Sequence, residues 1–372
     1  MMTSRERLLA VLHGKMPDRV PISCYELVGY DSRNFCNIEP SYRNLMEEIR
    51  AKTDCICMWN PESDEQLGTT AYVSDVETEI RNRPDGYETV TTYTIGGRKL
   101  TQCDRTIHGL YTTWRTEHLC KDTDDVDAVV SIPYKPVTYA TDDIARIQGE
   151  LGDHGILMPT VSDPAYLAMS LMEFGESTVW AMTEPEHFEE VVQELHRRNM
   201  NNLRCMLETT PGDLYRITGP EYMCPPYMPP AYFERFMLPY LSEMVQLIHA
   251  HGRLARIHCH GKIARVLDML VETGCDGIDP CEETPDGDIT LEELKARVGD
   301  RLCLFGSMQL KMLECCSTEE VIRQTRRMML AGKPGGRFVL MPTAAPIDVP
   351  LKKLTEDNYR AYIDTALEYA AY

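Results

Sequence analysis

Residues 254–280, LARIHCHGKIARVLDMLVETGCDGIDP, contain one complete strand–helix–strand unit. The apolar run LARIH predicts a strand, the periodic stretch from about Lys262 predicts a helix, and GIDP predicts the next strand. The same order recurs around other short apolar runs, namely GILMPT (155–160), LYRITG (214–219), LCLFG (302–306) and RFVLM (337–341). Short apolar strands that alternate with amphipathic helices predict a parallel sheet covered by helices.

About six such units after residue 140, with one or two more expected upstream, fit a closed (β/α)8 TIM barrel better than an open sheet. No glycine-rich dinucleotide or phosphate-binding motif follows any of these strands. Between about residues 68 and 118, alternating apolar and polar residues with glycine-containing turns predict an antiparallel meander. We therefore expect one α/β barrel domain over residues 1–372, with the meander as an N-terminal excursion.

Composition narrows the function classes. The 372 residues carry 38 Lys and Arg against 58 Asp and Glu, a net charge of −20, and 43% are hydrophobic. This negative charge repels phosphate backbones, so we expect no nucleic-acid partner. No uncharged apolar stretch is long enough to cross a membrane, and the start MMTSRERLLAVLHG lacks a signal-peptide core. We expect a cytoplasmic protein without a membrane partner, whose 14 cysteines are free thiols.

In a TIM barrel, the active site lies at the C-terminal ends of the strands, so polar residues that follow each strand are the candidates. This rule selects Ser162, Asp163, Glu221, His258 to His260, Asp279 to Glu283, Ser307 to Gln309 and Thr343 to Asp348. The strongest element is Ile257-His258-Cys259-His260-Gly261. His258 and His260, two positions apart, can present both imidazoles to one point, and neutral imidazole is a common zinc ligand. Cys259 points the other way in an extended segment and is expected to be a packed thiol.

The metal interpretation has an alternative, in which one histidine binds substrate and the other satisfies backbone groups without any metal. A catalytic zinc needs at least one more protein ligand. Glu282 after the next strand is the first candidate, Glu221 the second and Cys281 the third. Each of these residues also has an ordinary role. Glu282 could be a solvated charge, Glu221 a carboxylate at a helix end, and Cys281 a buried thiol.

Three other residues carry weaker signals. Asp348 lies in a proline-bracketed loop after the last recognisable strand, where it could orient a ligand histidine or a substrate hydroxyl, or simply cap a turn. Tyr222 belongs to the aromatic loop after Glu221, and Gln309 follows the LFG strand. Both are candidates for contacts with a bound cofactor or organic ligand, although Tyr222 also suits ordinary packing.

Several pieces of the sequence resemble the uroporphyrinogen decarboxylase superfamily. They are RERLLAVLHGKMPDRVPI (5–22), SDPAYLAMSLMEFGEST (162–178), MPPAYFERFMLPYLSEMVQLIHAHG (228–252), ARIHCHG (255–261), GCDGIDPCEETPDGDITLEELKARVGDRLCLFGSMQ (274–309) and TEDNYRAYIDTALEYA (355–370). They span nearly the whole chain in the family's order. The resemblance implies a (β/α)8 barrel independently of the strand count. It also implies one of two chemistries, uroporphyrinogen decarboxylation or zinc-dependent methyl transfer to a corrinoid protein, and a possible homodimer.

The decarboxylases of this superfamily carry an arginine-rich segment of the kind PxWxMRQAG that grips propionates. The equivalent stretch here, ISCYELVGYDSRNF (22–35), offers only Arg33, and a net charge of −20 suits an eight-carboxylate substrate poorly. The methyltransferases look closer, since their metal motif is HxCG, followed by a carboxylate and a late cysteine. His258 matches the motif histidine, His260 stands in place of the cysteine, and Glu282 falls at or beside the carboxylate. The late loop Met341-Pro342-Thr343-Ala344-Ala345 has no cysteine.

Imidazole and carboxylate ligands would leave zinc a harder Lewis acid than thiolates do, and a harder acid suits oxygen. We therefore hypothesise a methyltransferase that moves a methyl group from an oxygen of a small-molecule substrate to the Co(I) centre of a separate corrinoid protein. His258, His260 and either Glu282 or Glu221 would bind zinc, and the remaining carboxylate would protonate the departing oxygen. Decarboxylation of a porphyrinogen and ligand binding without catalysis are the alternatives.

Overall fold

The structure is a computed structural model that describes residues 2–70, 73 and 75–372. Its central strands are β1 (Cys55–Met58), β6 (Gly155–Met158), β7 (Thr160–Ser162), β8 (Leu214–Thr218), β9 (Leu254–His258), β10 (Gly277–Asp279), β11 (Cys303–Met308) and β12 (Phe338–Pro342). β1 pairs with β6, and β7 to β12 pair in chain order, all in parallel. β6 and β7 act as one strand interrupted at Pro159, whose carbonyl still accepts from the backbone of Arg216 in β8.

The sheet closes on itself through the extended segment around Ile22. This residue forms a parallel bridge to Leu340 of β12, and its carbonyl accepts a hydrogen bond from the backbone nitrogen of Asp54, directly before β1. The segment thus takes the place of the first strand between the two ends of the sheet. The (β/α)8 barrel expected from the sequence is confirmed.

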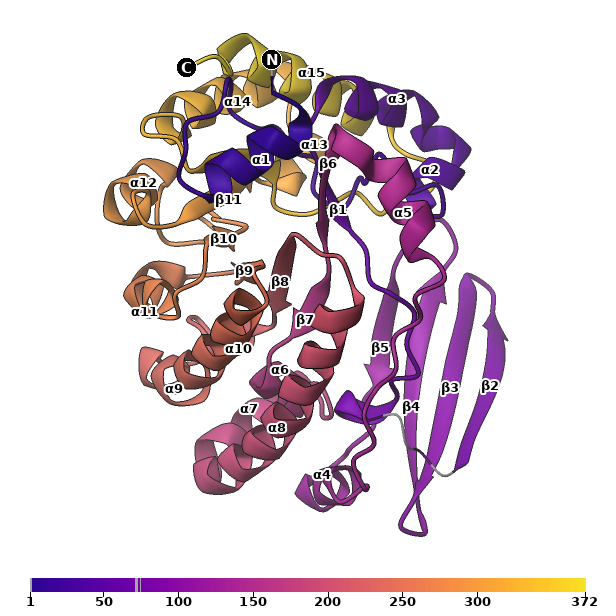
Figure 1. The fold of residues 1–372 in the computed structure, drawn as a ribbon. Coiled ribbons are helices and arrows are strands. Elements are labelled where there is room, and N and C mark those ends of the chain that lie inside the picture. The colour runs from indigo at the N-terminus through magenta and orange to yellow at the C-terminus, as the bar shows by residue number, and fades with distance from the viewer. Residues whose placement is uncertain (1, 71–72, 74) are drawn as a thin grey trace.

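Helices surround the parallel strands (Figure 1). They are α1 (Ser4–Leu12), α2 (Phe35–Ile38), α3 (Arg43–Lys52), α4 (Thr123–Val130), α5 (Ile144–Leu151), α6 (Pro164–Met169), α7 (Phe174–Thr183), α8 (Pro185–Thr209), α9 (Pro230–Phe236), α10 (Leu238–Ala250), α11 (Leu267–Glu272), α12 (Leu291–Val298), α13 (Leu310–Cys315), α14 (Thr318–Gly332) and α15 (Lys353–Tyr369). The helix expected from Lys262 begins instead with a short 3-10 turn, η5 (Ile263–Arg265), before α11.

The end of the barrel at the start of the strands is filled by side chains. Leu8, Val11 and Leu12 of α1 pack against inward residues such as Ile156 and Leu214 near the beginnings of β6 and β8. A second, larger core lies between the strands and the outer helices. The barrel is therefore closed at the N-terminal ends of its strands. The open end, at the C-terminal ends of the strands, is where an active site can lie.

The predicted meander is present as β2 (Asp75–Arg83), β3 (Gly86–Ile95), β4 (Arg98–Ile107) and β5 (Thr113–Glu117), paired antiparallel in that order. Of the expected range 68–118, residues 71, 72 and 74 lie outside the described residues. The sheet stands at one side of the barrel (Figure 1). The turn between β4 and β5 reaches the late loop, since Leu110 bridges Asp348 and the nitrogen of Tyr111 donates to the carbonyl of Ile347. The excursion thus forms part of the wall at the barrel mouth.

Two general expectations can be compared with the structure. The cysteines are free thiols, and most are buried. Among the described residues, no helix combines the length and the apolarity that crossing a membrane requires.

Candidate active site

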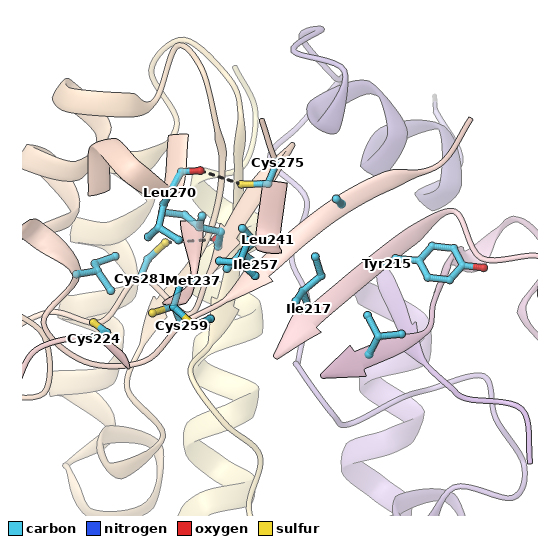
Figure 2. Close-up of a cluster of buried hydrophobic side chains, with 14 of the residues drawn as sticks. Tyr215, Ile217, Cys224, Met237, Leu241, Ile257, Cys259, Leu270, Cys275 and Cys281 are labelled. Carbon is cyan, nitrogen blue, oxygen red and sulfur yellow. Dashed lines mark hydrogen bonds between the residues drawn. The ribbon is translucent and has the colours of Figure 1, made fainter. Parts of the chain in front are cut away.

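Along β8 and β9, side chains alternate between the interior of the barrel and the core beneath the helices. Ile217 and Ile257 point outward into the core beneath the helices, where Figure 2 shows them with Leu241 of α10. Because neighbouring residues of a strand point to opposite faces, Arg216 and Arg256 point inward. These two arginines are register partners on adjacent strands. Figure 2 also places Cys259 in the outer core, where it is 3% exposed, so it is a packed thiol as expected.

His258, at the end of β9, belongs to a buried charged group. Its Nδ1 lies 2.7 Å from Oδ2 of Asp279, and Oδ1 of Asp279 lies 2.9 Å from Nε of Arg256. Burial alone would raise the pKa of Asp279, but the charge of Arg256 and the hydrogen bond from His258 hold it well below its usual range. Burial lowers the pKa of His258 to about 4, despite Asp279. At neutral pH, an uncharged imidazole therefore donates through Nδ1 and keeps its lone pair on Nε2.

His260 forms a second histidine–carboxylate pair beside the first. Its Nδ1 lies 3.1 Å from Oε1 of Glu282, while Oε2 of Glu282 accepts from the backbone nitrogen of Gly261. Burial opposes the charged imidazole, but the hydrogen bond to Glu282 outweighs it and raises the pKa of His260. The rings of His258 and His260 are 4.5 Å apart between centroids and nearly perpendicular. The structure thus brings the two predicted histidines together at one strand end.

The two pairs can be compared with what a zinc ion requires. A carboxylate on Nδ1 is the usual way in which a protein orients a histidine for a metal on Nε2. However, Glu282 uses both oxygens on His260 and Gly261, and a catalytic zinc takes three protein ligands. Within residues 2–70, 73 and 75–372, no three His, Cys, Asp or Glu side chains are grouped so that they could hold a metal. The arrangement leaves Nε2 of His258 and Nε2 of His260 as two nitrogen donors, which do not by themselves make a zinc site.

Glu221 lies in the 3-10 turn η4 (Pro220–Met223) directly after β8. Its Oε2 is buried without a hydrogen-bond partner, and burial raises its pKa, against the charges of His260 and Arg216. Asp163, the fully buried N-cap of α6, also has an unpartnered oxygen. Burial raises its pKa to about 8, and Glu221 adds to this shift. Asp163 therefore favours its protonated form at neutral pH, while burial shifts Glu221 in the same direction, and a protonated carboxyl can donate a proton.

A cavity of about 460 Å³ opens at the barrel mouth. Arg216 lines it, and Nη2 of Arg216 donates to the hydroxyl of Tyr25, whose ring lies 6.4 Å from that of His258. The other walls are Glu26, Leu27, Val28, Asn34, Phe35, Cys36, Met58, Trp59, Asn60, Tyr111, Thr112, Thr160, Ala345, Pro346 and Ile347. The cavity has the size of a small-molecule site, and both polar and apolar side chains line it.

The remaining predicted residues lie elsewhere. Asp348 forms a 2.8 Å ion pair with Lys352, and its carbonyl accepts from Tyr42, so its carboxylate is engaged in the late loop. Tyr222 packs edge-on against Tyr166 and Phe174 and lines a separate cavity between the meander and α6.

Gln309 is 7% exposed and donates to the carbonyl of Glu283. Cys281 is a buried thiol that donates to the carbonyl of Ile278. Neither side chain is placed beside the two histidines by these contacts.

Sequence reasoning selected Asp163 and Asp279 as strand-end residues without giving them a role, and it passed over Arg216 and Arg256. The signal for the arginines is present, because LYRIT and LARIH each carry an arginine at the third position of an otherwise apolar strand. A charge inside a buried strand needs a compensating group or a ligand.

Comparisons with known proteins agree on the fold. The sequence model described as uroporphyrinogen decarboxylase (URO-D) matches residues 114–366. A solved structure, a methyltransferase from Methanosarcina mazei, superposes with a TM-score of 0.60 at 17% identity, covering 99% of both chains. At that identity, the likeness shows the fold alone. No curated protein matches the sequence significantly.

Proposed function

The chain belongs to the uroporphyrinogen decarboxylase family, and we propose that within it the protein is a methyltransferase. It would move a methyl group from the oxygen of a small substrate, bound in the cavity at the barrel mouth, to a separate corrinoid protein. The fold likeness to a protein described as a methyltransferase is in keeping with this proposal, but the side chains at the strand ends carry it.

The observation on which the proposal rests is the buried Oε2 of Glu221, which has no hydrogen-bond partner and whose carboxyl is electrostatically coupled to His260. Removal of a methyl group from an ether oxygen leaves an alkoxide or phenolate, which is a poor leaving group unless it is protonated. Glu221 has a buried oxygen without a partner, and burial raises its pKa, so in this proposal it is the group that gives the proton. Neutral His258 offers a lone pair on Nε2 that can accept a hydrogen bond from the bound substrate.

The proposed step balances as follows. The Co(I) of the partner's corrinoid supplies the electron pair that takes the methyl group. As the carbon–oxygen bond breaks, its electrons stay on the substrate oxygen, and Glu221 transfers its proton to that oxygen. Glu221 then regains a proton from solvent. Asp279 keeps His258 in one tautomer throughout, because its ionised carboxylate can only accept the proton on Nδ1.

Zinc binding by His258 and His260 stays a prediction, and no step above depends on it. Elemental analysis of the anaerobically purified protein tests it directly. Near-stoichiometric zinc that is lost in both His258→Ala and His260→Ala would support a metal held by the two Nε2 atoms. An equal zinc content in the variants and the unaltered protein would contradict the prediction.

Decarboxylation of a porphyrinogen finds less support at this site. Arg33, the arginine of the segment that would grip propionates, is exposed and forms a 2.8 Å ion pair with Asp143. Among the described residues that line the cavity, Arg216 is the single cation. A substrate with eight carboxylates would need several cations.

The decisive experiment measures the product. The anaerobically purified protein is incubated with free cob(I)alamin and a panel of small methyl ethers, and the methylated corrinoid is followed by absorbance. We expect its formation with at least one ether and its loss in Glu221→Ala. A parallel incubation with uroporphyrinogen serves as the alternative test. Decarboxylated porphyrinogen, or methyl transfer that does not change in Glu221→Ala, would overturn the proposal.

A further inference from the structure

The meander ends in an exposed edge strand. In the order β2-β3-β4-β5, β2 is the edge that lies farther from the barrel, and β5 is the edge on the barrel side (Figure 1). Every residue of β2, Asp75–Arg83, is exposed. Among the described residues, no strand pairs with the outer edge of β2. The unpaired backbone groups of such an edge can accept a strand from another chain.

The register of the β2–β3 hairpin shows which backbone groups point outward. Arg83 pairs with Gly86 across a two-residue turn, and the pair that closes such a turn exchanges both of its backbone hydrogen bonds. The odd-numbered residues of β2 therefore bond to β3, while the N–H and C=O groups of the even-numbered residues, with Ile80 at their centre, point away from it. Pro84, the next even position, has no N–H, so a ladder on this edge ends there.

The charges of β2 are divided between its two halves. The acidic residues Asp75, Glu77 and Glu79 precede the basic residues Arg81 and Arg83. All five lie on one face of the sheet, because alternate residues of a strand share a face. Two antiparallel copies of this strand would therefore bring the acidic half of one copy opposite the basic half of the other.

One register pairs these charges without repulsion. When Ile80 lies opposite Ile80 of a second copy, Glu79 meets Arg81 and Glu77 meets Arg83 of that copy. A shift by two residues in either direction would place Glu79 opposite Glu79 or Arg81 opposite Arg81, and like charges directly opposite each other are destabilising. Within one chain Arg81 lies 2.8 Å from Glu79, but their side chains are 48% and 63% exposed, so both can meet a second copy.

The other face of the sheet favours the same register. Ile80 is 65% exposed, which leaves most of an apolar side chain in water. Contact between Ile80 and Ile80 of a second copy would cover part of this area. Backbone pairing, charge and apolar contact thus all select a two-fold axis at Ile80.

We propose that two copies of the protein associate through β2, which pairs antiparallel with β2 of the second copy about this axis. The two meanders then form one continuous sheet between two barrels. The family resemblance allows a homodimer but names no surface for it, and this edge supplies one. The inference is independent of the proposed methyl transfer, since no residue of β2 lines the cavity at the barrel mouth.

Sedimentation velocity of the full chain tests the proposal between about 1 and about 100 µM, where contacts of small area associate. We expect a reversible dimer in the unaltered protein. Glu79→Arg and Arg81→Glu should each weaken it by at least about 10-fold, because each variant sets two pairs of like charges opposite each other. An equal mixture of these two variants should dimerise again, since residues 79 and 81 then have opposite charges across the axis. Glu117→Arg on the other edge strand, β5, is the matched control and should dimerise like the unaltered protein.

A backbone variant tests the strand pairing itself. Ile80→Pro removes an N–H that points away from β3, so the hairpin keeps its own hydrogen bonds and the dimer should be lost. Ile80→Ala keeps that N–H and should still dimerise, with lower affinity. Thermal unfolding near that of the unaltered protein shows that both variants are folded. A protein that stays monomeric over the whole range, a dimer that does not change in the single charge variants, or a mixture that fails to dimerise would each overturn the inference.

Discussion

Nδ1 of His258 lies 2.7 Å from Oδ2 of Asp279, and both side chains are almost completely removed from solvent. The other oxygen of Asp279 is 2.9 Å from Nε of Arg256, so one carboxylate serves two neighbours. It fixes the tautomer of the imidazole, and it neutralises a guanidinium that is 0% exposed. Asp279 therefore has two roles: it orients His258 in the candidate site, and it neutralises Arg256 inside the barrel.

The first prediction concerns stability. Asp279→Ala should lower the free energy of unfolding by about 3–5 kcal/mol, because it leaves Arg256 buried and unpaired. Asp364→Ala is the matched control, since Asp364 is largely exposed in its pair with Lys52 and such a pair contributes about 1 kcal/mol or less. Denaturant unfolding of the three proteins measures both values. Equal losses in the two variants would show that Arg256 does not depend on Asp279.

The second prediction concerns the proton donor. Glu221→Gln keeps the size of the side chain but cannot donate an acidic proton, so methyl transfer should slow by about 10²- to 10⁴-fold. The loss should be smaller for methyl ethers of acidic phenols, which leave readily without protonation. Rates with two ethers of different leaving-group pKa test this dependence, and Glu234→Gln on the exposed face of α9 is the control. An equal loss for both ethers would contradict the role of Glu221.

The third prediction is a pH dependence that arises from Asp163. Its pKa is raised to about 8, mainly by burial, whereas an unfolded aspartate titrates near about 3.9. Between these pH values the folded protein holds a proton that the unfolded chain has lost, so stability decreases as pH rises. Asp163→Asn keeps an N-cap acceptor for Tyr166 and removes the titration, so the decrease should become shallower.

Denaturant unfolding at several pH values between 5 and 8 measures this slope. The same replacement at Asp122, the exposed N-cap of α4, controls for the change of capping residue itself. Parallel slopes for the unaltered protein and Asp163→Asn would mean that the carboxyl of Asp163 is ionised throughout.

The sequence predicted the barrel and the meander because both depend on local periodicity. Alternation also placed His258 and His260 together, since they are two residues apart on one strand. The sequence pattern could not show that Asp279 pairs with His258 and that Glu282 pairs with His260. Those contacts depend on how the ends of β9 and β10 come together, and position along the chain does not encode that arrangement.

Residues on separate loops were harder to place. Asp348 follows the last strand, as an active-site residue would, but its carboxylate turns to Lys352 while its backbone bridges Leu110 of the meander. Tyr222 lies one residue after Glu221 and still lines a different cavity. Strand-end position selects the mouth of the barrel but not the direction of each side chain.

The last prediction concerns the contact between the meander and the mouth. Tyr111, at the turn after β4, stacks on Phe35 and lines the cavity, while its backbone holds the late loop through Ile347. Tyr111→Ala keeps the backbone contact and removes the ring. Because one aromatic pair contributes about 0.5–1.5 kcal/mol, affinity for a methyl ether that the unaltered protein demethylates should fall by about 2- to 12-fold.

Calorimetry on Tyr111→Ala measures this loss, and Tyr87→Ala, an exposed tyrosine within β3, is the control that should bind normally. Thermal unfolding should change little in either variant, because Tyr111 is 58% exposed and contributes little to the core. Unaltered affinity in Tyr111→Ala would show that the meander only borders the cavity. A loss confined to Tyr111→Ala would show that the excursion supplies part of the binding surface, which the barrel strands alone do not complete.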